Sequence, residues 1–230
     1  FLLATIGLSA QKTVHDANAL TRSAKGFHAI EISDGIDLYL TQGNEEAVAV
    51  SASSNEYRDK IRVEVINGVL KIYYERDRSW GLNFNWGNRK LKAYVSARSL
   101  DKLSASGGAD VYVENELSSP QLSMEFSGGS DFRGKVNAQD LHLSTSGGSD
   151  AYISGHTEKL KIHSSGGSDI HGYDMISNFC TVETSGGSDV KITVNKEITG
   201  SASGGSDIYY KGNASSTANK SGGSGIKRVS

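Results

Sequence analysis

The sequence contains little of what several common protein classes require. Among 230 residues there is one cysteine, Cys180, and one proline. A single cysteine excludes an intrachain disulfide and a zinc site built from four cysteines. Neither sign of charge is in excess, because 24 basic and 26 acidic residues leave a net charge of −2. We therefore expect neither a nucleic acid nor an anionic membrane as the partner.

Long hydrophobic runs are also missing, and one short run lies at the start. Phe1–Leu8 is apolar and is followed by the small residues Ser9 and Ala10. This pattern is typical of the apolar core and cleavage region of a secretory signal without its basic start, and it is too short to span a bilayer. The sequence predicts a signal-peptide remnant at residues 1–10, no transmembrane segment, and export to the periplasm, the outer-membrane surface or the extracellular space. A short buried strand or helix is the alternative.

Helical periodicity is missing from every segment of useful length, apart from one turn expected at Ser54–Lys60. From Phe27 onward, short runs alternate apolar and polar residues and are rich in β-branched and aromatic side chains, as half-buried strands are. Examples are FHAIEIS, IDLYLTQ, AVAVSA, IRVEVI, VLKIYYE and LKAYVSA. Asn67-Gly68 joins two of these runs and fits a two-residue hairpin turn. The sequence predicts a mainly antiparallel N-terminal β region at residues 11–105.

Glycine, by contrast, is abundant, and a repeated pentapeptide holds about half of it. The Gly-Gly pairs of SGGSD and its near copies SGGAD and SGGSG supply 14 of the 27 glycines. The repeats begin at seven serines 18–21 residues apart: Ser106, Ser127, Ser146, Ser165, Ser185, Ser203 and Ser221. Apolar residues stand at fixed offsets on both sides of each repeat. Two short strands around a glycine corner, closed by a variable polar loop, form a rung, and stacked rungs form a parallel β-helix. We predict this solenoid at residues 106–230.

The corners are predicted to be structural. Adjacent glycines allow a path with positive φ, and Ser and Asp side chains can accept hydrogen bonds from the amides of the corner. The corner glycines are Gly107, Gly108, Gly128, Gly129, Gly147, Gly148, Gly166, Gly167, Gly186, Gly187, Gly204 and Gly205. The corner aspartates are Asp110, Asp131, Asp150, Asp169, Asp189 and Asp207. Ser33–Asp37 is a degenerate copy, so the N-terminal region is expected to begin with a rung-like turn.

A row of carboxylates at the spacing of stacked strands raises the question of bound cations. Neighbours about 4.8 Å apart repel by roughly 0.9 kcal/mol in water, so the row must be solvated, capped by amides or neutralised. In SGGSD the aspartate follows the second glycine by two residues, which does not match the calcium-binding nonapeptide repeat. We expect capping, with no bound metal and no cofactor. Bound calcium is the alternative.

Two sets of aromatic and basic residues are candidate ligand contacts. The first lies two residues after each corner aspartate: Tyr112, Arg133, Tyr152, His171, Lys191, Tyr209 and Lys227. These side chains could stack on sugar rings or meet acidic glycans, and the alternative is a ladder that stabilises neighbouring strands. The second set is Trp80, Phe84 and Trp86 in the segment DRSWGLNFNWGNRK. It is expected either to cover the sheet as a lid or to present its rings to a ligand.

Two longer blocks accompany the repeats and carry a family resemblance. They are GFHAIEISDGIDLYLTQG at Gly26–Gly43 and LKAYVSARSLDKLSASGGADV at Leu91–Val111. With the SGGSD series they resemble, over residues 18–225, the head GIN domain family of auto-transporter adhesins, found in exported proteins of Bacteroidetes. The resemblance implies a body similar to pectin-lyase-type β-helices, a Gly-Ser-Asp corner between sheets and a role in adhesion, and it brings no catalytic residues. Gly225 in place of the last aspartate indicates a frayed or capping final rung.

Recognisable catalytic motifs are missing from the sequence. Cleavage of a polysaccharide needs a pair of carboxylates in one cleft, whereas the acids here form a regular row. Cys180 occupies a leucine position of the repeat and is expected in the core. We therefore predict a non-enzymatic adhesion module of the cell surface or periplasm, compatible with homo-oligomers, that binds a glycan or a host or cell-surface protein. The alternatives are a structural envelope scaffold and a polysaccharide lyase or hydrolase.

Overall fold

The structure is a computed structural model that describes residues 16–75 and 89–230. Within these residues the regular elements are strands, apart from one short helix, α1 (Asn55–Asp59), in the predicted place. The strands are β1 (Leu20–Arg22), β2 (Ala29–Ile32), β3 (Asp37–Gln42), β4 (Ala47–Ser51), β5 (Ile61–Ile66), β6 (Val69–Tyr74), β7 (Lys92–Ala97), β8 (Lys102–Ser106), β9 (Val111–Ser127), β10 (Phe132–Ser146), β11 (Ala151–Ser165), β12 (Ile170–Ser185), β13 (Val190–Ala202), β14 (Asp207–Lys211), β15 (Ser215–Lys220) and β16 (Gly225–Arg228). The prediction of an all-β protein with a parallel solenoid is confirmed.

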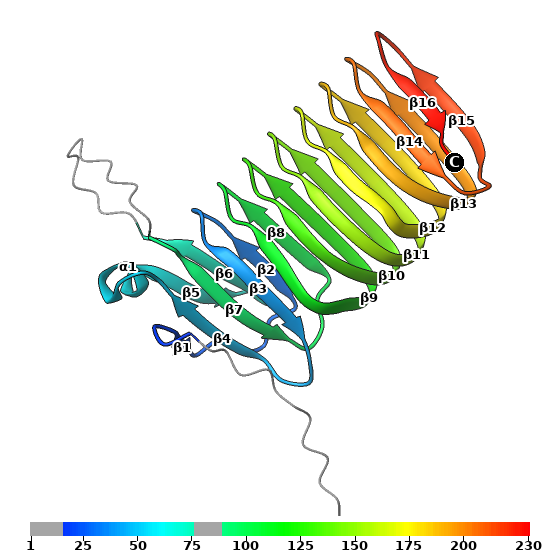
Figure 1. Cartoon of the computed structure of the whole chain (residues 1–230). Coiled ribbons are helices and arrows are strands. Elements are labelled where there is room, and N and C mark those ends of the chain that lie inside the picture. Colours follow the sequence, from blue (N-terminus) through cyan, green and yellow to red (C-terminus); the bar gives the residue numbers. More distant parts are fainter. Residues whose placement is uncertain (1–15, 76–88) are drawn as a thin grey trace, which may run out of the picture.

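The solenoid has two faces that are built from the same long strands (Figure 1). β9 to β13 each contribute one half to each face, and successive strands pair in parallel. One face, called the ladder face below, runs from β4 through β7, β3 and the first halves of β9–β13 to β14 and β16. The other, called the groove face, runs from β5 through β6, β2, β8 and the second halves of β9–β13 to β15.

The two faces meet at a bend, not at the polar loop expected between rungs. The segments ENELSSPQ and SGHTEK lie inside β9 and β11, so that expectation was wrong. Differences in repeat length are absorbed by β-bulges, such as the one that sets Arg133–Lys135 opposite Tyr112–Glu116. At the bend of β11 the hydroxyl of Thr157 lies 3.1 and 2.9 Å from the carbonyl oxygens of Gln139 and Lys159. Backbone hydrogen bonds thus continue through this polar segment, whereas a loop would have left its amide and carbonyl groups without strand partners.

The N-terminal strands continue the same coil. The pairs β1–β4, β4–β7 and β5–β6 are antiparallel, as expected. In addition, β3 pairs in parallel with β7 and β9, and β2 pairs in parallel with β6 and β8. Asp34 and Gly35 have φ of 61° and 71°, and Gly107 stacks against Asp34, so the rung-like turn predicted at Ser33–Asp37 is confirmed. The parallel pairing follows from this turn, because β3 leaves it in the direction in which β9 leaves the first SGGAD corner.

The core consists of apolar columns that run along the solenoid axis. The six residues that follow the corner aspartates, from Val111 to Ile208, are each at most 1% exposed. Cys180 is also buried, which raises the pKa of its thiol to about 12, and it is a core residue as predicted. Every residue of β15 is exposed, so the apolar columns thin out at the last rung. A single rung cannot enclose such columns, and the fold is therefore stable only as a stack.

Candidate ligand-binding faces

The SGGSD corners form one column along the solenoid. Both glycines of each corner, from Gly107 to Gly205, have φ between 65° and 90°. A Cβ on the first glycine would meet the backbone of the preceding corner at 3.0–3.4 Å, whereas a Cβ on the second would meet nothing within 4 Å. The first glycine is therefore required by both conformation and packing, and the second by conformation alone.

Serine side chains join each corner to the one before it. The second serine of each SGGSD motif is fully buried. Its hydroxyl oxygen accepts hydrogen bonds from amides of the preceding corner. Ser188 Oγ, for example, accepts from the amides of Gly167 and Ser168 at 3.2 and 3.1 Å. These bonds satisfy amides that the corner removes from the strand ladders.

The corner aspartates hydrogen-bond in the opposite direction. Oδ1 of each accepts from the amide of the next aspartate at 2.9–3.0 Å, over the five steps from Asp110 to Asp207. Asp37 continues the column, and there burial together with the charge of Asp110 raises the pKa of the carboxyl group. The carboxylates lie in a line. Within the described residues no three His, Cys, Asp or Glu side chains group to hold a metal ion.

Beside the aspartates, aromatic and basic side chains form a continuous ladder. They occupy one register position on successive strands: Tyr112, Arg133, Tyr152, His171, Lys191, Tyr209 and Lys227. The rings of Tyr152 and His171 stack with centroids 4.5 Å apart. The guanidinium of Arg133 lies 4.8 Å from the Tyr152 centroid and 5.9 Å from that of Tyr112. The structure thus brings residues of the predicted row together as stacked neighbours.

Two tyrosines that the SGGSD spacing does not reveal extend the ladder. Tyr39 on β3 and Tyr94 on β7 stack with centroids 5.2 Å apart, and Tyr39 stacks on Tyr112 at 5.3 Å. A signal is present in the sequence, because Asp37–Tyr39 repeats the Asp-apolar-Tyr order of Asp110–Tyr112. This signal places the tyrosines side by side only because β3 pairs in parallel with β7 and β9, and an antiparallel pairing would not do so.

The middle of the ladder borders a shallow depression of about 430 Å³. Its lining includes Tyr152, His171, Tyr173 and Lys191. Tyr152 is 40% exposed, although Arg133 and His171 lie against its ring. Because those neighbours stack along the ladder, what the ladder presents to solvent is mainly ring edges, hydroxyl groups and cationic groups. Tyr152 therefore has no open ring face on which a sugar could stack.

The uncompensated charge at the centre of the ladder face is negative. Arg133 lies 3.6 Å from Asp131, two residues before it. Among the residues that the structure describes, no cationic nitrogen lies within 4.0 Å of the three central carboxylates, Asp150, Asp169 and Asp189. This face therefore disfavours an anionic ligand.

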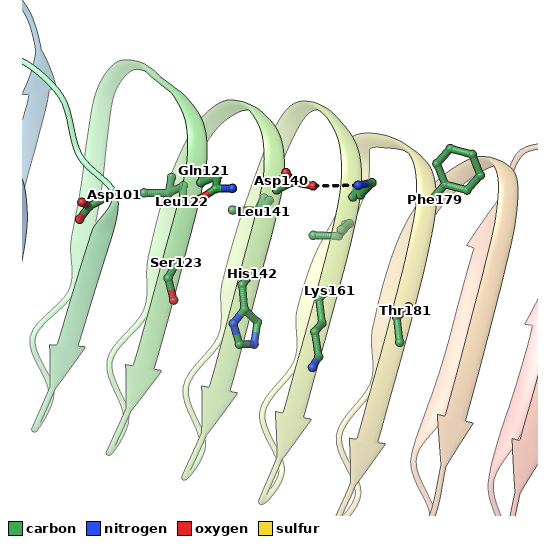
Figure 2. A pocket seen from close by; sticks show the side chains of 12 residues that line it. Asp101, Gln121, Leu122, Ser123, Asp140, Leu141, His142, Lys161, Phe179 and Thr181 are labelled. Carbon is green, nitrogen blue, oxygen red and sulfur yellow. Dashed lines mark ion pairs between the residues drawn. The ribbon is translucent and has the colours of Figure 1, made fainter.

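The groove face carries a second concavity, of about 550 Å³, that crosses β8 to β12 (Figure 2). Two outward rows flank it in strand register: Gln121, Asp140, Lys159 and Phe179 near the bend, and Ser123, His142, Lys161 and Thr181 two residues further along. Leu122, Leu141 and Leu160 lie between the rows. None of these was predicted as a site residue, because each is an ordinary polar or core position within its own repeat. Only the stacking of rungs gathers them.

Two predictions fall on residues that the structure does not describe. Trp80, Phe84 and Trp86 lie outside the described residues, as does the predicted signal remnant at residues 1–10. Across residues 16–75 and 89–230, no helix has the length and apolar character needed to cross a membrane.

The fold and its corners define a class of protein: an all-β, two-faced parallel solenoid whose rungs are joined by a buried serine column and an aspartate column. Within that class, this chain belongs to the family described as "Putative auto-transporter adhesin, head GIN domain", which matches residues 26–214. The family resemblance predicted from the sequence is confirmed. No curated protein matches the chain.

Solved structures share the fold over nearly the whole chain. A "putative adhesin" from Bacteroides fragilis has a TM-score of 0.82 at 22% identity, covering 93% of this chain and 98% of that one. A "putative adhesin" from Parabacteroides merdae has a TM-score of 0.71 at 16% identity, covering 92% and 95%. A "putative lipid binding protein" from Parabacteroides distasonis has a TM-score of 0.69 at 16% identity, covering 94% and 98%. At these identities the similarity establishes the fold alone.

Proposed function

We propose that the protein is an exported adhesion module of the cell envelope that binds a glycan on its ladder face and catalyses no reaction. Membership of the adhesin family supports the role in adhesion. The choice of the ladder face rests on one observation: the column of corner aspartates and the ladder run side by side. Rung after rung, a corner carboxylate stands two residues from a phenol, imidazole, ammonium or guanidinium group in the ladder.

Such a repeated acceptor and donor suits a repeated, hydroxyl-rich ligand. Oδ1 of the central aspartates is engaged by backbone amides, whereas Oδ2 of Asp150, Asp169 and Asp189 has no hydrogen-bond partner among the described residues. Sugar hydroxyl groups would donate to these oxygens and accept from Lys191 and its ladder neighbours. Rungs recur about every 4.8 Å, so a polymer would make several weak contacts whose effects multiply.

The arrangement of the acids supports binding over hydrolysis. Two carboxylates that cleave a glycosidic bond converge on one cleft, whereas these are spread along the solenoid and are fastened to backbone amides. A structural scaffold of the envelope is the second candidate, and the mutual stacking of Tyr152 with His171 favours it, because a ladder can simply hold rungs together.

A clear loss of glycan affinity at the ladder should require the removal of two contacts. We expect Tyr152→Ala or Lys191→Ala alone to weaken the affinity by about two- to fivefold, and the double variant by about tenfold, since each solvated contact contributes about 0.5–1 kcal/mol. A glycan array would find the ligand and titration calorimetry would measure it. Lys71→Ala is the control, because Lys71 pairs with Glu31 on the groove face.

Two results would contradict the proposal. If the folded protein binds no glycan on the array, the scaffold is favoured. If the double variant retains the wild-type affinity for a confirmed ligand, the ladder face is not the site.

A further inference from the structure

The residues that line the concavity on the groove face form rows that cross the strands (Figure 2), and the concavity is called the channel below. It extends from Asp101, the residue before β8, across β9 to β12, which corresponds to roughly 19 Å at about 4.8 Å per strand spacing. Its volume of about 550 Å³ lies within the range of ligand sites. Because it runs perpendicular to the strands, its lining repeats once per rung. A channel of this kind fits an extended chain better than a compact molecule.

The acids beside the channel already have polar partners. Asp101 lies 2.9 Å from Nδ1 of His28, and Asp140 lies 3.8 Å from Nζ of Lys159, the ion pair drawn in Figure 2. Lys161 is exposed, stands in the other row beside His142, and points away from this pair (Figure 2). Within the described residues no carboxylate oxygen lies within 4.0 Å of its ammonium group. The ammonium group of Lys161 is therefore uncompensated in the middle of the channel.

In the next outward row along the strands, the acids also have partners. Glu125 lies 3.1 Å from Nζ of Lys102, and Glu183 lies 3.7 Å from Nδ1 of His163. His142 neighbours Lys161 in register and is likewise exposed, without an acidic partner in the described part of the chain. A carboxylate that enters the channel would thus meet the ammonium group of Lys161 and the imidazole of His142 without breaking an existing contact.

An exposed aromatic ring stands at one end of the channel. Phe179 is 37% exposed and follows Lys159 in register on the next strand. Nζ of Lys196 lies 5.0 Å from the centroid of its ring. A large apolar side chain on an otherwise polar strand surface offers a sugar ring a place to pack, next to a further cationic group. Gln121, at the opposite end, supplies both a hydrogen-bond donor and an acceptor.

We propose that this channel is a second binding site, distinct from the ladder face, and that its occupant is an acidic polysaccharide whose carboxylates meet Lys161 and His142. The polymer lies along the solenoid axis, with successive sugars over successive rungs. The ladder face repels the same polymer, because the carboxylates of Asp150, Asp169 and Asp189 are uncompensated there. The two faces therefore select glycans of different charge.

Titration calorimetry with polygalacturonate oligomers at low salt tests this site. We expect binding by the wild-type protein and about five- to thirtyfold weaker binding by Lys161→Glu, because the substitution removes one attraction of about 0.5–1 kcal/mol and adds a repulsion of similar size. The same oligomers with methyl-esterified carboxyl groups should bind at least tenfold more weakly to the wild-type protein. Lys220→Glu, which changes an exposed lysine of β15 outside the channel, is the matched control and should leave the affinity unchanged. Thermal unfolding of each variant checks that the fold is intact.

Four outcomes would overturn the assignment. They are no binding of polygalacturonate, equal binding of the esterified oligomers, loss of binding in Lys220→Glu with retention in Lys161→Glu, and equal binding of a sulfated glycan, which would indicate a general polyanion surface. This site does not depend on the ladder-face proposal. If a neutral glycan binds the wild-type protein but not the Tyr152→Ala/Lys191→Ala double variant, that result concerns the ladder face alone.

Discussion

At the scale of a single residue, the two glycines of a corner are constrained differently. Gly147 and Gly148 have φ of 67° and 78°, but only at Gly147 would a Cβ meet backbone, the amide nitrogen of Gly128 at 3.2 Å. We expect Gly148→Ala to lower the free energy of unfolding by about 1–2 kcal/mol through backbone strain. Gly147→Ala should cost about 2–3 kcal/mol, because the rung must also shift. Urea unfolding monitored by circular dichroism measures both.

Gly223 is the matched control for these corner variants. It lies in the last corner, has no positive φ and has open space around its Cα. Gly223→Ala should leave stability unchanged or raise it slightly, since alanine restricts the unfolded chain. Equal destabilisation by Gly147→Ala and Gly148→Ala would show that the close stacking of the first glycines carries no energetic weight.

At the scale of an element, each rung depends on a serine of the next. Ser188 is fully buried, and its Oγ accepts from the amides of Gly167 and Ser168. We expect Ser188→Ala to lower the free energy of unfolding by about 1–3 kcal/mol, because it leaves two amides without a partner. Ser185→Ala changes the half-exposed first serine of the same motif and should cost less than about 0.5 kcal/mol. Chemical unfolding measures both variants, and an equal loss of stability in the two would contradict the proposed role of Ser188.

At the scale of the whole molecule, backbone hydrogen bonds join the aspartates of the column from rung to rung. Each Oδ1 from Asp110 to Asp189 is already bound to a backbone amide, and the carboxylates lie in a line instead of converging on one point. We expect millimolar calcium or a chelator to shift the melting temperature by less than about 1 °C. A ligand present at a hundred times its Kd would stabilise by about 2.7 kcal/mol, a shift of several degrees. Such a rise, measured by scanning calorimetry, would reveal a calcium site.

Much of the solenoid could be predicted because its determinants are local. The Gly-Gly pair requires positive φ wherever it stands, and the residue after each corner aspartate must point inward once the strand leaves the corner. The regular spacing therefore predicts the core column from Val111 to Ile208, the burial of Cys180 and one register position for the outward row from Tyr112 to Lys227. The degenerate corner at Ser33–Asp37 was recognisable for the same reason.

The sequence by itself determined the rung: its corner, its inward residues and its repetition. Only the tertiary structure decided that the polar segments of β9 and β11 bend within continuous strands, that β3 pairs in parallel with β7 and β9, and that Tyr39 and Tyr94 join the ladder. It also decided that residues such as Lys161 and Phe179 share one channel. The physical reason is that turn conformation and inward alternation are set by neighbours along the chain, whereas strand partners and the surfaces between rungs are set by hydrogen bonds and packing between distant segments.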